Sequence, residues 1–144
     1  MKNINSSYWL SVKRTIRFGE TDAAGVMHFH NVFRWCHESW EESLEKYGLS
    51  IQSIFPVENK ESGRINIYLP IVYTKADFYL PLYTGDLLTI ELSPVKIDPF
   101  SFEIEYILKK SSKVSANVVI RHLSIDPETR MRSLLPQSIN LWIE

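Results

Sequence analysis

Residues 30–48 read H-N-V-F-R-W-C-H-E-S-W-E-E-S-L-E-K-Y-G, and this stretch decides the fold. Its hydrophobic residues recur at the spacing of an α-helix, with charged residues on the opposite face. Gly48 marks the stop of the helix, and Asn31 or His30 marks its start, Asn31 being the better cap. The pattern predicts a helix of about 18 residues, roughly 27 Å long. Its buried stripe is expected to consist of Phe33, Cys36, Trp40, Leu44 and Tyr47.

The sequence on both sides of this helix is typical of β-strands. Residues 10–18 alternate between apolar and polar side chains, with Arg14 as the one break in the pattern. The loop at residues 19–29 then leads into the helix. Later segments rich in β-branched and aromatic residues are separated by turn residues, and they lie at 64–69, 71–80, 87–92, 100–108 and 114–125. A nine-residue strand spans about 30 Å, so a curled antiparallel sheet can wrap one helix along its whole length.

The composition excludes several classes of protein. The chain has 144 residues, of which 44% are hydrophobic and 23% charged, and this predicts one globular domain over residues 1–144. A net charge of −1 offers no basic patch to nucleic acid. No apolar run reaches the roughly 18 residues of a membrane span, and residues 1–8 lack the apolar core of a signal peptide. Because Cys36 is the one cysteine, we expect no intrachain disulfide and a cytoplasmic location.

The loop before the helix carries a family motif. Residues 17–34 read R-F-G-E-T-D-A-A-G-V-M-H-F-H-N-V-F-R. This stretch resembles the 4-hydroxybenzoyl-CoA thioesterase family of hotdog proteins, in which a D-x-x-G-hydrophobic loop runs into the central helix. Asp22, Gly25 and Val26 match that loop, and Asn31 matches an Asn near the helix start. Residues 69–72, 77–81 and 85–90 also match in order. The resemblance implies an α+β hotdog fold, a curled antiparallel sheet wrapped around one long central helix.

Hydrolysis of a thioester needs few protein groups. The leaving thiolate has a conjugate thiol with a pKa of about 8.5, so it departs with little help from an acid. A nucleophile and donors for the oxyanion remain to be supplied. By the resemblance, Asp22 is the catalytic carboxylate, as nucleophile or as the base that activates water, and the backbone N–H of Phe29 or of a close neighbour points at the thioester carbonyl. An Asp-Ala-Ala-Gly stretch is also typical of a simple turn.

Further residues are predicted to bind the substrate. They are Gly25, His28, Phe29, Asn31 and Tyr73. Related enzymes carry Tyr or His at the position of Phe29, whose own side chain cannot act as an acid or base. His28 either replaces that polar group or faces solvent, and the hydroxyl of Tyr73 is expected to meet a ring hydroxyl of the substrate. The phosphates of coenzyme A require cations, for which the candidates are Lys109, Lys110, Lys113, Arg121, Arg130 and Arg132.

Other catalytic chemistries have no support in the sequence. His28, His30 and His37 lack the spacing of metal ligands, and no pair of cysteines accompanies them. Cys36 falls on the apolar stripe, which favours a buried small hydrophobe over a nucleophile. The sequence contains no G-x-S-x-G elbow and no phosphate-binding glycine motif. We therefore expect neither a metal nor a cofactor.

Within the family, three features are most similar to the 1,4-dihydroxy-2-naphthoyl-CoA thioesterases of phylloquinone and menaquinone synthesis. They are Cys36-His37-Glu38, the L-P-I-V stretch at residues 69–72, and Phe29 itself. The resemblance implies hydrolysis of an aromatic acyl-CoA by a homodimer or homotetramer, with Phe78 either lining the pocket or filling the core. The alternatives are a thioesterase for 4-hydroxybenzoyl-CoA, fatty acyl-CoA or acyl carrier protein, and a non-catalytic module that binds acyl groups.

Overall fold

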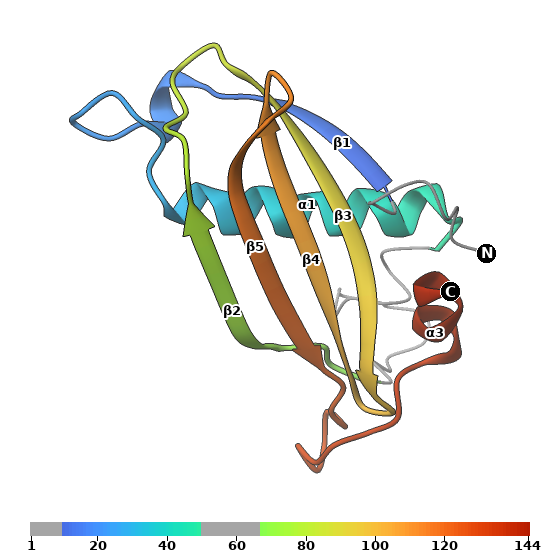
Figure 1. The fold of residues 1–144 in the computed structure, drawn as a ribbon. Coiled ribbons are helices and arrows are strands. Elements are labelled where there is room, and N and C mark those ends of the chain that lie inside the picture. The colour runs from blue at the N-terminus through green and yellow to red at the C-terminus, as the bar shows by residue number, and fades with distance from the viewer. Residues whose placement is uncertain (1–9, 50–66) are drawn as a thin grey trace, which may run out of the picture.

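The computed structural model describes residues 10–49 and 67–144 of the chain. They form a five-stranded antiparallel sheet in the order β1-β3-β4-β5-β2, with a long helix across one face (Figure 1). The prediction of a curled antiparallel sheet around one long helix is confirmed. The elements are β1 (Leu10–Thr15), the 3-10 helix η1 (Phe18–Glu20), α1 (His30–Lys46), β2 (Ile71–Phe78), β3 (Leu87–Asp98), β4 (Ser101–Lys110), β5 (Lys113–Leu123) and α3 (Gln137–Ile143).

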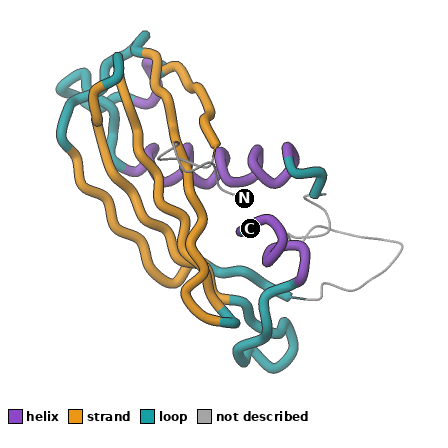
Figure 2. The backbone as a smooth tube through the Cα atoms, turned by 45° about the vertical axis from the view of Figure 1, so that its right-hand side comes forward, coloured by secondary structure: helices purple, strands orange, loops and turns teal. Residues whose placement is uncertain are grey.

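The hydrophobic core lies between the curled sheet and the helices. Figure 2 shows α1 and α3 on the same side of the sheet. Alternate residues of the three central strands are buried on this side, as the period of a half-buried strand requires. Each large side chain that is fully buried there contributes about 1.5–3 kcal/mol. The strand residues of this core include Leu88, Ile90, Leu92, Phe102, Ile104, Tyr106, Leu108, Val118 and Ile120.

The buried face of α1 is wider than the predicted stripe. Cys36, Trp40 and Leu44 have no exposed surface, as predicted, and Phe33 is partly buried. The prediction for Tyr47 is wrong, because this residue follows the last helical residue and 53% of its surface is exposed. The buried face also includes Val32, Trp35, Ser39 and Ser43. Both serine hydroxyls donate to carbonyl groups of their own helix, which satisfies them inside the core.

The two ends of α1 are stabilised differently. The helix begins at His30, as predicted, but Asn31 is not its cap. Asn31 lies in the first turn, where its side-chain amide donates to the backbone carbonyl of Glu20 at 2.9 Å. At the other end, Gly48 adopts a φ of 78° and the two hydrogen bonds of a Schellman motif close the helix. The prediction that Gly48 stops the helix is confirmed.

Strand β1 is shorter than predicted, and its irregular residue has a structural reason. The strand ends at Thr15, three residues earlier than predicted, and η1 begins at Phe18. Phe18 is therefore 82% exposed, not inward-facing as the alternation predicts. Arg14, the break in the alternation, pairs with Glu42 and lies 3.8 Å from a carboxylate oxygen of Glu38. Arg14 thus ties β1 to α1.

The later strands follow the predicted segments and turns, with some differences in length. The β4–β5 hairpin turns at Ser111 and Ser112, whose φ values of 49° and 66° suit a type I′ turn. Strand β3 continues past residue 92 as far as Asp98. Of the segment predicted at 64–69, residues 64–66 lie outside the described chain, and Tyr68 forms a single bridge with Ile125. Helix α3 is not foreseen by the sequence pattern. No described helix is long and apolar enough to cross a membrane.

Candidate active site

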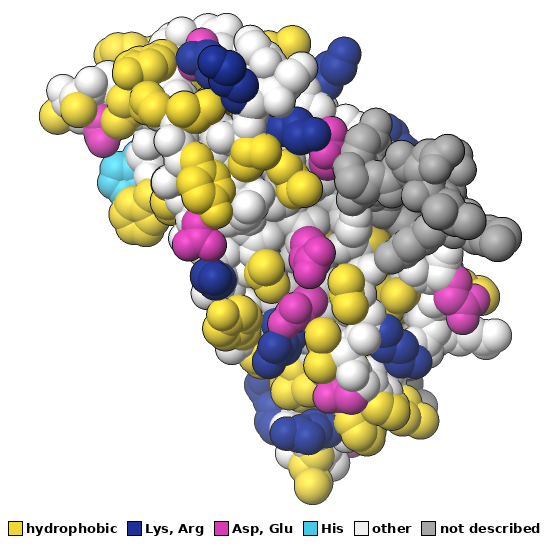
Figure 3. All heavy atoms as spheres, in the orientation of Figure 1, with side chains coloured by type: hydrophobic (Ala, Val, Ile, Leu, Met, Phe, Trp, Pro, Cys, Tyr) yellow, Lys and Arg dark blue, Asp and Glu magenta, His cyan; other side chains and the backbone are white. Residues whose placement is uncertain are grey.

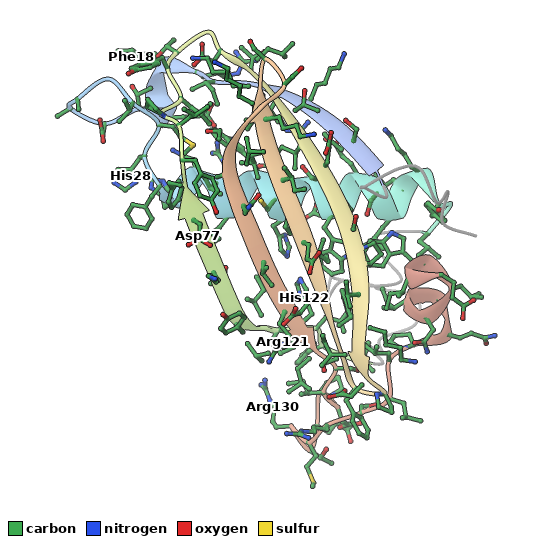
Figure 4. The ribbon with its side chains drawn as sticks, in the orientation of Figure 1. Phe18, His28, Asp77, Arg121, His122 and Arg130 are labelled. Atoms are coloured by element: carbon green, nitrogen blue, oxygen red, sulfur yellow. The ribbon has the colours of Figure 1, made fainter. Side chains whose placement is uncertain are left out.

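A cavity of about 410 Å³ opens where the end of β2 approaches the start of α1. Two segments far apart in the sequence line it. The first contributes Asp22 and residues 26–29, and the second contributes residues 78–82. Figure 4 shows His28 at this end of α1, beside the arrowhead of β2. The walls are mostly apolar and contain one carboxylate, so the cavity suits an apolar ligand that carries a reactive polar group.

Asp22 lies in a tight loop that its own carboxylate helps to hold. Its Oδ1 atom accepts hydrogen bonds from the N–H groups of Ala24 at 2.8 Å and Val26 at 3.4 Å. The N–H of Asp22 donates to the carbonyl of Val26 at 2.7 Å. Within the described part of the chain, no residue hydrogen-bonds Oδ2. The same side chain can therefore stabilise the turn through one oxygen and present the other to a ligand.

Gly25 and two backbone hydrogen bonds fix the shape of this loop. Gly25 has a φ of 79°, in the left-handed region that favours glycine. A Cβ atom at this position would meet no atom within 4 Å, so the backbone conformation sets the requirement for glycine. The N–H of His28 donates to the carbonyl of Glu20 at 2.8 Å, and the N–H of Met27 donates to that of Leu82 at 2.7 Å. The second bond joins the two walls of the cavity.

The start of α1 presents a backbone donor in the same cavity. Phe29 precedes the first helical residue, and no described residue accepts a hydrogen bond from its N–H. The first N–H groups of a helix have no partner within the helix, and they carry a partial positive charge. Such a position stabilises an anion. A negative charge that develops on a bound carbonyl oxygen can be stabilised by this donor.

The two histidines that flank Phe29 contact each other. The Nδ1 atoms of His28 and His30 form a hydrogen bond, so one imidazole donates and the other accepts. The ring of His28 also stacks on that of Phe29, with 4.9 Å between the centroids. His28 thus lines the cavity as part of an aromatic wall. In residues 10–49 and 67–144, no three His, Cys, Asp or Glu side chains converge in a way that could hold a metal ion.

Three predicted substrate contacts do not line this cavity: Gly25, which shapes the loop instead, Asn31 and Tyr73. Asn31 is 4% exposed and binds the carbonyl of Glu20, so it anchors the loop to the helix. Tyr73 lies on β2 with the guanidinium of Arg121 5.2 Å from its ring centroid. Figure 4 shows Arg121 toward the opposite end of β2 from His28. The structure therefore brings Asp22 together with His28 and Phe29, but not with Asn31 or Tyr73.

The second wall of the cavity is only partly foreseen from the sequence. Phe78 is 48% exposed and Tyr79 is 57% exposed, so both rings are available to a ligand and neither fills the core. Leu80 and Leu82 also line the cavity, although nothing in the sequence marks them as site residues. The available signal is Pro81, since proline lacks the N–H that a paired strand donates and is therefore disfavoured inside a sheet.

Cys36 and the candidate cations for coenzyme A do not line the cavity. Cys36 is fully buried, and burial raises the pKa of its thiol well above the usual value, which excludes a nucleophilic role. Its interpretation as a buried hydrophobe is confirmed. Among the candidate cations for coenzyme A, Lys109, Lys110 and Arg121 pair with carboxylates on neighbouring strands and turns. The described residues therefore do not single out one basic cluster as the phosphate site.

Comparison with known proteins identifies the family of the chain. The family profile of the Thioesterase-like superfamily matches residues 16–143. The chain belongs to the thioesterase-like superfamily. A 1,4-dihydroxy-2-naphthoyl-CoA hydrolase of Prochlorococcus marinus (strain MIT 9313) is 48% identical to this superfamily member over 141 residues, which are 98% of this chain and 93% of that protein.

Solved structures of other thioesterases share the fold. The crystal structure of a putative thioesterase from Prochlorococcus marinus str. MIT 9313 has a TM-score of 0.89 and 48% identity, with 94% of each chain covered. A 1,4-dihydroxy-2-naphthoyl-CoA thioesterase from Synechocystis has a TM-score of 0.82 and 28% identity, and the match covers 92% of this chain and 93% of that one. The predicted hotdog fold of this thioesterase-superfamily member is confirmed.

Proposed function

We propose that this protein is a cytoplasmic thioesterase that hydrolyses 1,4-dihydroxy-2-naphthoyl-CoA to 1,4-dihydroxy-2-naphthoate and coenzyme A, in the synthesis of phylloquinone or menaquinone. The observation that carries the proposal is the position of Asp22 in one cavity with the helix start at Phe29, between aromatic walls. Curated relatives of nearly the same length are named for this activity.

The proposed mechanism uses the two polar features of the cavity. The carbonyl oxygen of the thioester accepts a hydrogen bond from the N–H of Phe29, which stabilises the negative charge that develops during attack. Asp22 supplies the other half of the reaction, either by attacking the carbonyl carbon or by activating a water molecule. Both routes need the carboxylate of Asp22 and the helix start in one fixed arrangement. The thiolate of coenzyme A then leaves without a dedicated acid. On the direct route this leaves a mixed anhydride between the acyl group and Asp22, and attack by water releases the carboxylate product and restores Asp22.

The walls of the cavity favour a planar acyl group. Phe29, Phe78 and Tyr79 contribute aromatic rings, and the volume of about 410 Å³ lies within the usual range for small-molecule sites. An aromatic pair adds about 0.5–1.5 kcal/mol beyond the burial of area. A long aliphatic chain instead loses conformational freedom on binding. Tyr79 is the tyrosine that lines the cavity, and its hydroxyl is the group expected to meet a ring hydroxyl of the acyl group.

The substrate proposal predicts a clear order of kcat/KM. We expect dihydroxynaphthoyl-CoA to exceed palmitoyl-CoA by at least about tenfold, because one or two ring contacts supply the roughly 1.4 kcal/mol that a tenfold ratio requires. 4-Hydroxybenzoyl-CoA, with one ring, should fall between them. Release of free coenzyme A, followed with a thiol-trapping dye, measures all three. Equal or faster hydrolysis of palmitoyl-CoA would exclude the aromatic substrate and leave the thioesterase activity standing.

We also propose that a second copy of the chain pairs with β2 and completes the site. β2 pairs only with β5 among the described strands, and nearly all of its residues are exposed. Ile71, Val72 and Tyr73 are 48%, 50% and 45% exposed. Figure 3 shows hydrophobic side chains along this edge. An exposed apolar edge strand is normally covered, and symmetric pairing between copies covers it. The cavity at the end of β2 would then lie at the boundary of two subunits.

This pairing predicts a defined effect of one charge. Val72→Lys places a cation on the β2 edge of both copies, and we expect the dissociation constant of the dimer to rise by at least about tenfold. Leu141→Lys is the matched control, because Leu141 is 58% exposed on α3, away from that edge. Sedimentation velocity at several protein concentrations distinguishes the two variants. A wild-type protein that sediments as a fully active monomer would contradict the proposal.

A further inference from the structure

Glu20 is a largely buried carboxylate that the proposed chemistry does not use. It ends η1, two residues before Asp22, and its side chain is 12% exposed. One oxygen, Oε2, accepts a hydrogen bond from Nε1 of Trp35 at 2.7 Å and pairs with Arg34. The other, Oε1, accepts the N–H of Arg17 at 2.9 Å. The carboxylate therefore fastens the segment before Asp22 to the second turn of α1.

The backbone of Glu20 fastens the far end of the same loop. Its carbonyl oxygen accepts the N–H of His28 at 2.8 Å and the side-chain amide of Asn31 at 2.9 Å. Residues 21–28 thus form a loop whose two ends are both attached to Glu20. Main chain and side chain together hold both ends of the loop against two successive turns of α1, whose start carries Phe29.

We infer that Glu20 is a positioning residue, which sets the distance between the Asp22 carboxylate and the N–H of Phe29. Glu20 does not line the cavity, so it acts through the two groups that do. Catalysis depends steeply on such distances, since a misplacement of about 1 Å can cost about 100-fold in rate. Among the described residues, no side chain of residues 18–22 other than Glu20 has a hydrogen bond or ion pair with α1, so the polar side-chain contact from this end of the loop depends on Glu20. The kinetic part of the inference rests on the proposed thioesterase function.

Two substitutions at Glu20 and one control test the inference. Glu20→Ala should lower kcat by about tenfold or more while KM changes less than about threefold, because the cavity walls remain. Glu20→Gln should restore kcat to within about threefold of wild type, since the amide oxygen still accepts from Trp35. Glu42→Ala is the matched control, because Glu42 also ties a segment preceding α1 to the helix, through Arg14. We expect Glu42→Ala to keep the wild-type kcat.

Several separate results would contradict the positioning role of Glu20. If Glu20→Ala retains more than half of the wild-type kcat, or if Glu42→Ala loses as much, Glu20 has no positioning role. Should Glu20→Ala fail to fold, Trp35→Phe removes only the buried donor, and an unchanged kcat would overturn the inference. Hydrogen–deuterium exchange distinguishes a failure of the positioning inference from a failure of the proposed thioesterase function, because it does not require turnover of a substrate. Glu20→Ala or Trp35→Phe should speed amide exchange in residues 21–29 but not in β4, whereas Glu20→Gln should change it little, whichever thioester the wild type hydrolyses.

Discussion

Asp22→Asn is expected to lower kcat by about 100-fold or more and to leave the fold intact. The amide oxygen of Asn can still accept the N–H groups of Ala24 and Val26, so the loop keeps its shape. An amide is neither a useful base nor a nucleophile, so the reaction loses the group that attacks or activates water. Steady-state hydrolysis of the preferred acyl-CoA gives kcat, and circular dichroism with thermal melting reports on the fold.

A matched control separates chemistry from turn geometry. Asp126 occupies a comparable turn, where its Oδ1 accepts the N–H groups of Glu128 at 2.9 Å and Thr129 at 2.8 Å. Asp126→Asn should therefore match Asp22→Asn in its small effect on melting temperature while keeping kcat near wild type. If Asp22→Asn also retains near-normal turnover, Asp22 is a turn residue and the mechanism proposed above is wrong.

The second large effect is a loss of stability in acid, caused by His122. This residue of β5 has no exposed surface, and its ring stacks on Phe102 with 5.2 Å between the centroids. Its Nδ1 donates to the carbonyl of Leu69 at 3.0 Å, while Nε2 has no partner among the described residues. Burial, together with the nearby His37, lowers the pKa of His122 from 6.5 to about 4, although the hydrogen bond to the carbonyl of Leu69 acts in the opposite direction. The folded protein therefore holds the imidazole neutral.

The sign of the effect follows from the two protonation states. Below pH 6.5 the unfolded chain takes up a proton on this imidazole, whereas the folded chain does so only near pH 4. The contribution of His122 to the free energy of unfolding is thus complete above pH 7 and is lost as the pH falls from 6.5 through about 4. The difference between the two pKa values corresponds to about 3 kcal/mol at most.

Chemical denaturation at fixed protein concentration measures this effect. Wild type should lose stability steeply between pH 6.5 and 4, and His122→Phe, which keeps a ring but cannot titrate, should lose clearly less over the same interval. Val114→Thr is the control, because Val114 is an exposed residue of the same strand and neither side chain titrates, so the wild-type slope should be unchanged. Parallel pH curves for wild type and His122→Phe would show that His122 does not govern the acid response.

The parts of the fold that the sequence predicts are those determined by residues close to one another along the chain. The spacing of Cys36, Trp40 and Leu44 indicates a helix and its buried face because an α-helix repeats every 3.6 residues. Gly48 predicts the helix end because glycine adopts the required left-handed conformation more easily than any other residue type. By contrast, the exposure of Phe18 depends on where β1 leaves its partner strand. Nothing within a few residues of Phe18 carries that information.

The candidate site likewise contains some residues that the sequence identifies and others that only the structure reveals. Asp22 and Phe29 belong to one continuous motif, so the sequence identifies them together. Tyr73 and Phe78 lie on one strand, and only the three-dimensional arrangement shows that Phe78 reaches the cavity and Tyr73 does not. The contact between Glu20 and Trp35 joins residues 15 positions apart across a loop, and no sequence period connects them. A short helix such as α3 offers too few turns for its period to be recognised.

The two-walled construction of the cavity has a consequence for how such enzymes diversify. In the proposed mechanism the reacting groups belong to residues 22–29, whereas residues 78–82 form the other wall of the cavity, against which the acyl group would lie. Backbone pairing connects the walls, through the bridge between Val26 and Tyr83 and the hydrogen bond from Met27 to Leu82, and it is independent of the side chains. Substitutions in residues 78–82 can therefore change which acyl group is bound, while residues 22–29 keep the same reaction.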